Sequence, residues 1–333
     1  MGRLHPIRFR WDTEWGAEAF RSSPSQRWAH HGIATTRRGY VVTMSARESE
    51  VIVLTPGGRL DRRFDIDVTV AHGLTTDAED DEVFWVADNG QVPVPHSDGT
   101  YVTEPATGHV TGAVMKFSLD GEELLRLPTP PLDIYATGDY SPTHVTVDSS
   151  HAGGTGDIWV ADGYGQSLVH RYDRSGRYRD TISGTEGAGR FSRPHAVVID
   201  RRRGQPQLYV ADRSNGRLQV FDLDGTYLRV VDDLISPGGF AVIGEHLYVA
   251  ELDARICVLD REDRIIGTVS GSGDPSRDRP GWPNRLDDEG RTVRPELRDG
   301  EFSTPHGIAA GPGGCLYVTE WLVGGRLVRL VPE

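Results

Sequence analysis

A short motif that recurs along the chain is the feature that most constrains its fold. The motif is an apolar residue, Tyr or Trp, Val, Ala or Thr, and Asp or Glu. Its five complete copies start at Phe84, Ile158, Leu208, Leu247 and Leu316, and residues 40–45 form a weaker sixth copy. Such recurrence is typical of repeat architectures, in which every unit packs against its neighbours.

Each copy lies within a series of short strands that are separated by turns. Another apolar run follows each complete copy, and the Asp-Gly or Ser-Gly pairs at 120–121, 175–176 and 224–225 predict tight hairpins. Four-stranded antiparallel units repeated six times predict an all-β fold, the six-bladed β-propeller. The units start near His31, His72, His144, His195, Gly239 and His306.

The ends of the chain bear on how the ring closes. A blade cannot bury both of its faces alone, so residues 1–333 are predicted to form a single domain. The last unit supplies only three strands before Glu333. We therefore expect an N-terminal strand within Ile7–Trp15 to complete that blade, which would remove an open sheet edge.

Three long insertions interrupt the repeat, at residues 89–112, 128–142 and 271–303. Insertions in such folds commonly gather on one face and shape a binding site. Plain surface loops are the alternative interpretation.

Composition excludes several classes of function. The net charge of −13 argues against a nucleic-acid partner, because it offers nothing to neutralise phosphates. No apolar run is long enough to span a membrane, and the N-terminus lacks a signal-peptide core. The two cysteines, Cys257 and Cys315, form neither a metal-binding pair nor a disulfide framework, so we predict buried thiols and a cytoplasmic location.

Histidine stands at five of the six unit starts, far more often than 12 histidines among 333 residues would by chance. The innermost strand of each blade begins there, so the imidazoles should face the central channel. His72, His195 and His306 come from alternate units and should converge with three-fold symmetry. Three histidines with an open fourth position form a known catalytic metal site, usually for zinc. Simple inheritance of a hydrogen-bonding residue by each unit is the alternative.

The other alternate set is incomplete, because Gly239 accompanies His31 and His144. These two histidines are additional candidate ligands, although repeat inheritance is the favoured interpretation for them.

Three further residues could take part in chemistry beside a metal. Arg213 directly follows the motif in unit four, and Tyr164 comes two residues after it in unit three, both near one mouth of the channel; Arg47 has a similar place in unit one. A tyrosine beside a dication can act as a base, and an arginine can hold a carboxylate by two contacts. Ordinary loop capping is the alternative. No motif of serine hydrolases or of nucleotide-binding proteins occurs.

These residues resemble a known family. The repeat resembles the NHL repeat of six-bladed propellers and, within that group, peptidyl-α-hydroxyglycine α-amidating lyase. The segments that carry this resemblance are residues 71–74 with 85–88, 161–167, 191–195 with 210–219, and 302–306. Asp-Gly-Tyr at 162–164 and Ala-Asp-Arg at 211–213 are the specific parts, and the insertions are unmatched.

The resemblance implies a function. In the family, three histidines that match His72, His195 and His306 bind zinc, a catalytic tyrosine matches Tyr164, and an active-site arginine matches Arg213. A second catalytic arginine aligns near Arg47, where the local match is poor. The implied reaction cleaves the C–N bond of an α-hydroxyglycine and gives an amide and glyoxylate.

The chain also departs from the family. The family's disulfide cysteines are absent, with Gly165 and Gln219 near those motifs. Gly307 stands where the family has an acidic calcium ligand, so a calcium site is not expected. The family gives no ligand at His144, which leaves iron or copper as alternatives to zinc.

The sequence therefore predicts a metal-dependent lyase that takes a small α-hydroxylated, carboxylate-bearing substrate in the channel mouth. Another metal-dependent propeller enzyme, a hydrolase, lactonase or redox enzyme, is one alternative. Propeller lactonases use Asn among their calcium ligands, and of the three asparagines in the chain only Asn215 lies near a channel-mouth motif. A non-catalytic propeller that binds protein partners is the other alternative.

Overall fold

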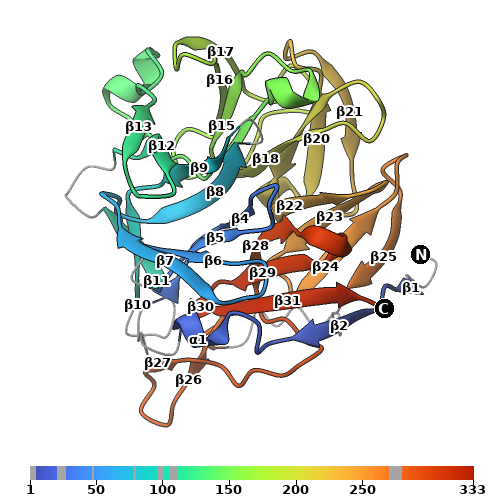
Figure 1. Ribbon diagram of the computed structural model, residues 1–333. Coiled ribbons are helices and arrows are strands. Elements are labelled where there is room, and N and C mark those ends of the chain that lie inside the picture. Colours follow the sequence, from blue (N-terminus) through green and yellow to red (C-terminus); the bar gives the residue numbers. More distant parts are fainter. Residues whose placement is uncertain are drawn as a thin grey trace.

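The computed structural model describes residues 5–20, 28–46, 49–77, 80–95, 101–105, 111–269 and 280–333. Six antiparallel sheets of four blade strands surround a common centre, as a six-bladed β-propeller requires (Figure 1). The predicted fold class is thus confirmed.

The blades follow one another along the chain, and the strands of each blade run in order from the innermost to the outermost. Blade 1 contains β4 (Ile33–Thr35), β5 (Val41–Met44), β6 (Glu50–Leu54) and β7 (Leu60–Asp65). Blade 2 contains β8 (Ala71–Asp77), β9 (Asp80–Asp88), β12 (Ala113–Ser118) and β13 (Glu123–Arg126). Blade 3 contains β14 (His144–Val147), β15 (Ile158–Asp162), β16 (Leu168–Tyr172) and β17 (Tyr178–Ile182).

The second half of the ring repeats this order. Blade 4 contains β18 (Pro194–Asp200), β19 (Gln207–Asp212), β20 (Arg217–Phe221) and β21 (Tyr227–Val231). Blade 5 contains β22 (Pro237–Ile243), β23 (His246–Glu251), β24 (Arg255–Leu259) and β25 (Ile265–Val269). Blade 6 contains β28 (Pro305–Ala310), β29 (Leu316–Glu320), β31 (Arg326–Pro332) and β2 (Phe9–Asp12).

The N-terminus closes the ring, as the sequence predicts. Strand β2 pairs antiparallel with β31, and Phe9 lies opposite Pro332 (Figure 1). This strand occupies the middle of the predicted range Ile7–Trp15. An additional short strand, β1 (His5–Pro6), pairs in parallel with β25 at the outer edge of blade 5, which the sequence did not indicate.

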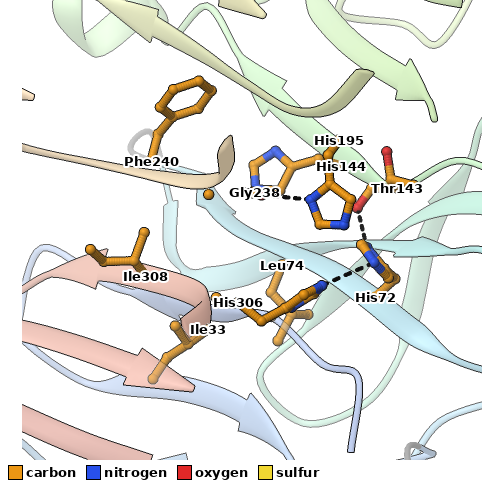
Figure 2. A pocket seen from close by; sticks show the side chains of 13 residues that line it. Ile33, His72, Leu74, Thr143, His144, His195, Gly238, Phe240, His306 and Ile308 are labelled. Atoms are coloured by element: carbon orange, nitrogen blue, oxygen red, sulfur yellow. Dashed lines mark hydrogen bonds between the residues drawn. The ribbon is translucent and has the colours of Figure 1, made fainter. Parts of the chain in front are cut away.

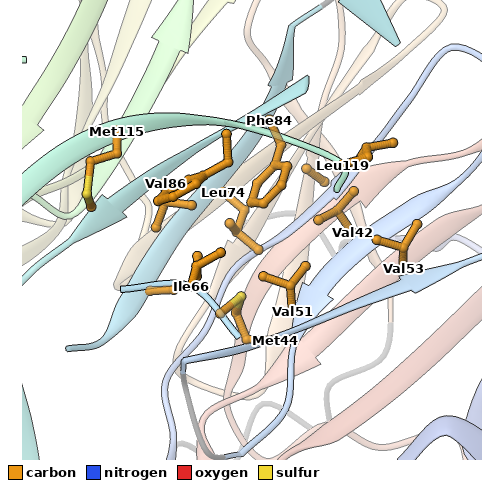
Figure 3. Close-up of a cluster of buried hydrophobic side chains, with 13 residues drawn as sticks. Val42, Met44, Val51, Val53, Ile66, Leu74, Phe84, Val86, Met115 and Leu119 are labelled. Atoms are coloured by element: carbon orange, nitrogen blue, oxygen red, sulfur yellow. The ribbon is translucent and has the colours of Figure 1, made fainter. Parts of the chain in front are cut away.

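Within the described residues the hydrophobic core forms six clusters, one between each pair of neighbouring blades. In the cluster between blades 1 and 2, Val42 and Met44 face Phe84 and Val86 (Figure 3). The other five clusters join blades 2 and 3, 3 and 4, 4 and 5, 5 and 6, and 6 and 1. Burying one such side chain stabilises the fold by about 1.5–3 kcal/mol. Hydrophobic contacts therefore close the ring together with the β2–β31 pairing.

The insertions and the remaining short elements connect strand ends at the face where the inner strands begin. This group contains α1 (Ala17–Phe20), β3 (Trp28–Ala29), β10 (Gln91–Pro95), β11 (Tyr101–Pro105), η1 (Asp133–Ala136), η3 (Arg213–Asn215), β26 (Arg285–Leu286), β27 (Thr292–Val293) and β30 (Leu322–Val323). At other loops lie η2 (Ser150–Ala152) and η5 (Pro312–Gly314). Parts of two insertions, residues 96–100, 106–110 and 271–279, lie outside the described residues.

Both cysteines are buried free thiols, as predicted, and burial raises the pKa of Cys257 to about 12. The helices in the described part of the chain are all too short or too polar to cross a bilayer.

Candidate metal centre

Three of the predicted histidines lie at irregularities in the innermost strands. The pairing of each inner strand with its neighbour shifts register between residues 71 and 73, 194 and 197, and 305 and 307. These shifts surround His72, His195 and His306. A bulge turns a side chain away from the regular alternation of a strand. In this ring it lets the three imidazoles approach one another (Figure 2).

The three imidazoles are close together and almost completely buried. The ring centres of His72 and His195 are 4.7 Å apart, those of His72 and His306 are 4.7 Å apart, and those of His195 and His306 are 5.0 Å apart. The Nε2 atoms of His72 and His306 lie 3.2 Å from each other. The structure therefore brings together the trio that alternation along the repeat selected.

Hydrogen bonds to the following blade fix how two of these rings are protonated. Nδ1 of His72 donates to the carbonyl oxygen of Thr143 at 2.7 Å, and Nδ1 of His195 donates to that of Gly238 at 2.6 Å (Figure 2). A carbonyl can only accept, so the proton is on Nδ1 and Nε2 keeps its lone pair. Metal-binding histidines are commonly oriented in this way.

The surroundings keep the rings neutral. Burial lowers the pKa of His72 to about 3. Burial also holds the pKa values of His195 and His306 well below the usual range, and the Arg213 charge and the neighbouring histidines lower them further. Near neutral pH these imidazoles therefore offer lone pairs, which is the form that binds a metal.

A fourth histidine, which the sequence reasoning missed, belongs to the same cluster. Strand β3 pairs with β30 of blade 6 and carries the adjoining His30 to the trio. One ligand atom from each of His30, His72, His195 and His306 lies within 4.8 Å of every other. His30 precedes its repeat unit, and its only sequence signal is the His-His pair at 30–31.

The two additional candidate ligands lie outside this four-histidine cluster. His144 pairs with Ala161 as Gly73 pairs with Ala87, so it corresponds to the residue after the bulged histidine of blade 2. Thr143 therefore takes the histidine position in blade 3. A one-residue shift sends a strand side chain to the opposite side, which explains why the alignment of unit starts misassigned His144.

His31 is buried but lines a different space from its neighbour His30. Its side chain borders a cavity of about 840 Å³ between blades 1 and 6, together with Trp15, Arg294 and Arg326. Burial lowers the pKa of His31 to about 4.

Tyr164 and Arg213 lie at the cluster, as the sequence predicts for residues of the channel mouth. The hydroxyl oxygen of Tyr164 is 3.2 Å from Nε2 of both His30 and His195 and 3.3 Å from that of His72. Arg213 donates to the same oxygen at 3.3 Å, and its guanidinium lies 5.3 Å from the centre of the tyrosine ring. The predicted Arg47 lies outside the described residues.

A buried carboxylate holds the loop that carries Tyr164. Asp162 accepts from the backbone N–H groups of Ser141 and Gln166, and Tyr135 donates to it at 2.6 Å. Tyr135 and Ser141 both belong to the insertion 128–142, so this insertion helps to position Tyr164.

The nitrogen atoms of the cluster suit a cation. Nε2 of His72 and Nε2 of His195 keep their lone pairs, and both atoms lie within reach of the Tyr164 hydroxyl. A divalent metal would bind several of these buried imidazole nitrogens at once, so the donor set fits one.

An acidic calcium ligand does not fit at position 307. A Cβ atom on Gly307 would lie 2.5 Å from the hydroxyl oxygen of Thr319 and 3.1 Å from the Cα atom of Gly32. The close approach of the neighbouring inner strand thus accounts for glycine there.

Substrate access differs on the two sides of the cluster. Farther along the inner strands, a cavity of only about 20 Å³ lies among Leu74, His144, Phe240 and Ile308 (Figure 2). That volume holds about one water molecule. Half-buried Tyr164 and Arg213 lie at the other side, where the insertions connect.

Comparisons with known proteins agree with the resemblance of the repeat to the NHL repeat. The chain is 27% identical over 251 residues to NHL repeat-containing protein 3 of Mus musculus, covering 70% of this chain and 62% of that protein. It is 28% identical over 197 residues to peptidyl-glycine alpha-amidating monooxygenase B of Xenopus laevis, covering 54% of this chain and 19% of that protein. The chain therefore spans only part of the length of these relatives. No family model matches it.

A solved structure supports the fold. The structure of a streptogramin B lyase covers 98% of each chain with a TM-score of 0.60 and 14% sequence identity, a likeness that concerns the fold alone. The chain is thus a six-bladed propeller whose repeats resemble the NHL repeat, and it is similar in sequence to the amidating enzymes.

Proposed function

We propose that this propeller is a metal-dependent lyase that cleaves the C–N bond of a small α-hydroxylated, carboxylate-bearing substrate. The observation that carries the proposal is the convergence of His72, His195 and His306 with the hydroxyl of Tyr164 and the guanidinium of Arg213. These groups offer a metal site, a proton acceptor and an anion-binding group side by side. The similarity to amidating monooxygenases is independent support.

The three repeat histidines would hold the metal through Nε2. Their Nδ1–H groups are engaged by backbone carbonyls of the next blade in the cases of His72 and His195, which fixes the ring orientations before any ligand arrives. A bound divalent metal would supply Lewis-acid chemistry, which makes the hydroxyl group of the substrate more acidic.

Tyr164 and Arg213 would have separate tasks. The Tyr164 oxygen, already directed at the histidine cluster, would accept the hydroxyl proton of the substrate while its own proton passes to the leaving nitrogen. The Arg213 guanidinium, half-buried beside it, binds the substrate carboxylate and so fixes which carbon faces the tyrosine.

The proposed reaction is balanced without a further reactant. The O–H electrons form a carbonyl bond, the C–N bond breaks, and the leaving nitrogen takes up one proton. An N-acyl-α-hydroxyglycine thereby becomes an amide and glyoxylate, with no oxidant and no water consumed.

The substrate would enter from the face that carries the insertions. The opposite side of the histidine cluster is filled by apolar side chains around the small cavity of about 20 Å³. We propose that the 840 Å³ cavity beside His31 receives the acyl part of a larger substrate, since its wall combines Trp15 and Leu327 with arginines.

The test combines metal analysis with a product assay. Untagged protein is purified without added metal, analysed for metal content and incubated with an N-acyl-α-hydroxyglycine while glyoxylate is measured. We expect bound zinc, iron or copper and glyoxylate release, both lost in His195→Ala and both retained in the control His246→Ala, which alters a partly exposed histidine of blade 5.

Other outcomes point to the alternatives. Metal without glyoxylate release, combined with hydrolysis of a lactone or with redox turnover, would replace the lyase by another metal-dependent enzyme. Protein that binds no metal even after reconstitution would contradict the catalytic proposal and favour a binding propeller.

A further inference from the structure

We propose that His30 is a fourth metal ligand, so that the centre is a four-histidine site suited to a divalent metal with five or six ligands. This inference rests on the proposed metal centre, but it concerns a residue outside the repeat and a coordination number that three histidines do not imply.

The position of His30 is fixed by packing rather than by the repeat. The β3–β30 pairing sets Trp28 opposite Val323 and brings the segment beside blade 6. The His30 ring lies 5.3 Å from Trp321, which stacks on Trp28 at 5.7 Å and meets Trp282 edge-on at 5.8 Å. Such an aromatic wall holds the imidazole in one orientation.

That orientation directs His30 to the same point as the repeat histidines. Its ring centre is 4.4 Å from that of His72 and 4.7 Å from that of His306. Its Nε2 atom is 3.2 Å from the Tyr164 hydroxyl, the same distance as Nε2 of His195. His30 thus approaches the cluster as closely as the residues that the repeat supplies.

The adjacent histidine shows that this placement is specific. Consecutive side chains of an extended segment point to opposite sides. His31 accordingly lines the separate 840 Å³ cavity, and it is absent from the group of histidines that could share a metal. The His-His pair therefore contains one candidate ligand and one built-in control.

A fourth imidazole changes which metal chemistry is possible. Catalytic zinc usually has three protein ligands and an open fourth position. Four histidines would complete a tetrahedron and leave no position for substrate. Iron(II), cobalt(II) and copper(II) accept imidazole ligands and readily take five or six, which leaves a position on the side of Tyr164 and Arg213.

A direct test counts the imidazoles without altering the protein. Wild-type protein is loaded with one equivalent of Cu²⁺ and studied by pulsed electron paramagnetic resonance, in which the remote nitrogen of each bound imidazole modulates the echo. Modulation from four histidines is expected. Modulation from three would overturn the inference.

A second test uses variants and Co²⁺ binding, measured by competition with a chelator. His30→Ala should weaken binding by more than about 100-fold, the upper end of what loss of an outer-shell partner does. It should also intensify the visible Co²⁺ absorption, because four-coordinate Co²⁺ absorbs more strongly than five- or six-coordinate Co²⁺. The conservative variant His30→Gln should give a Co²⁺ affinity and an absorption between those of wild type and His30→Ala. His31→Ala should match wild type in both readouts.

Failure of this inference is distinguishable from failure of the proposed function. If His30→Ala binds Co²⁺ as wild type does while His195→Ala does not, the centre has three ligands and only the fourth is wrong. If both variants retain wild-type Co²⁺ binding, the cluster is not a metal site and the proposed function falls as well.

Discussion

Two rings of side chains lie next to each other at the face where the inner strands begin, and they behave differently. One ring is acidic and ends the second strand of five blades, at Asp88, Asp162, Asp212, Glu251 and Glu320. The other is the histidine cluster at the axis. Both are buried, and the acidic residues and three of the four histidines recur with the repeat.

The carboxylates have their hydrogen bonds satisfied within the fold. Glu320 accepts from the N–H groups of Ser303 and Thr304, at 2.5 Å and 3.0 Å, and pairs with Arg326 at 3.2 Å. Each of the other four likewise accepts backbone N–H groups from the segment that leads into the inner strand of its own blade. The acidic ring therefore fixes the entry of the inner strands, including those that carry the histidines.

The histidines are held differently. Nδ1 of His72 and Nδ1 of His195 donate to backbone carbonyls, whereas Nε2 of His72 faces Nε2 of His306 and Nε2 of His195 faces the hydroxyl of Tyr164. Burial is thus common to both rings, and the convergence of several neutral imidazole nitrogens is what makes only the histidine cluster a candidate metal centre.

Metal content is the property in which variants of the histidine cluster and variants of the acidic ring should differ most. The double variant His72→Ala/His195→Ala removes two ligands, so bound metal should fall from about one equivalent per chain to near zero. Inductively coupled plasma mass spectrometry on untagged protein measures this. The double variant should remain folded by circular dichroism. Retention of metal would show that the histidine cluster is not the metal site.

The next largest effect concerns catalysis beside the histidine ring. Tyr164→Phe removes the proposed proton acceptor and should lower kcat by about 10²- to 10⁴-fold, the usual range for a general base. Metal content should stay at the wild-type level, which separates this variant from the histidine variants. A kcat within error of wild type would remove Tyr164 from the proposed reaction.

The acidic ring should respond in stability rather than in metal binding. Glu320→Gln leaves Arg326 without its buried partner, and loss of one member of such a pair costs about 3–5 kcal/mol. Urea unfolding of the metal-free protein measures the change. As a control, Glu245→Gln alters an exposed pair with Arg261 and should cost less than about 1 kcal/mol. Equal losses of unfolding free energy in the two variants would show that burial of the ion pair does not increase the cost of breaking it.

The smallest effect is a pH dependence of stability at a third buried site. Burial lowers the pKa of His170 from about 6.5 to about 3, at a position where its ring contacts Tyr135 and Thr181. Between these values the unfolded chain binds a proton that the folded chain does not. The free energy of unfolding should therefore fall as the pH falls below 6.5, by up to about 1.4 kcal/mol per pH unit from this group.

Urea unfolding of wild type and His170→Gln at several pH values isolates that contribution, because groups common to both proteins largely cancel. The variant should show the shallower slope on the acid side. Parallel slopes would mean that the imidazole accepts its proton in the folded state as readily as in the unfolded one.

Local sequence patterns made much of the fold predictable. The strand motif ends in an acidic residue in all five complete copies, and Asp-Gly or Ser-Gly turns join the third and fourth strands of blades 2, 3 and 4. Strand order and the six-fold repeat therefore follow from short segments. The missing strand of the last unit likewise pointed to closure by the N-terminus, which the pairing of Phe9 with Pro332 confirms.

The candidate site was predictable only where it inherits the repeat. His72, His195 and His306 share one position in alternate units, and Tyr164 and Arg213 lie within two residues of the end of the strand motif. His144 was placed one residue out of register, because a bulge accompanies the histidine in blades 2, 4 and 6, whereas the described pairing of β14 with β15 is regular.

The sequence by itself determined the blades, their number and the three-fold histidine arrangement, because strand periodicity and turn chemistry act over a few residues. Only the tertiary structure decided that His30 joins the cluster and His31 does not. That choice depends on the pairing of β3 with β30, segments nearly the whole chain apart, and on the packing of Trp28 against Trp321. Contacts between distant segments are set by the free energy of the assembled ring, which no local pattern encodes.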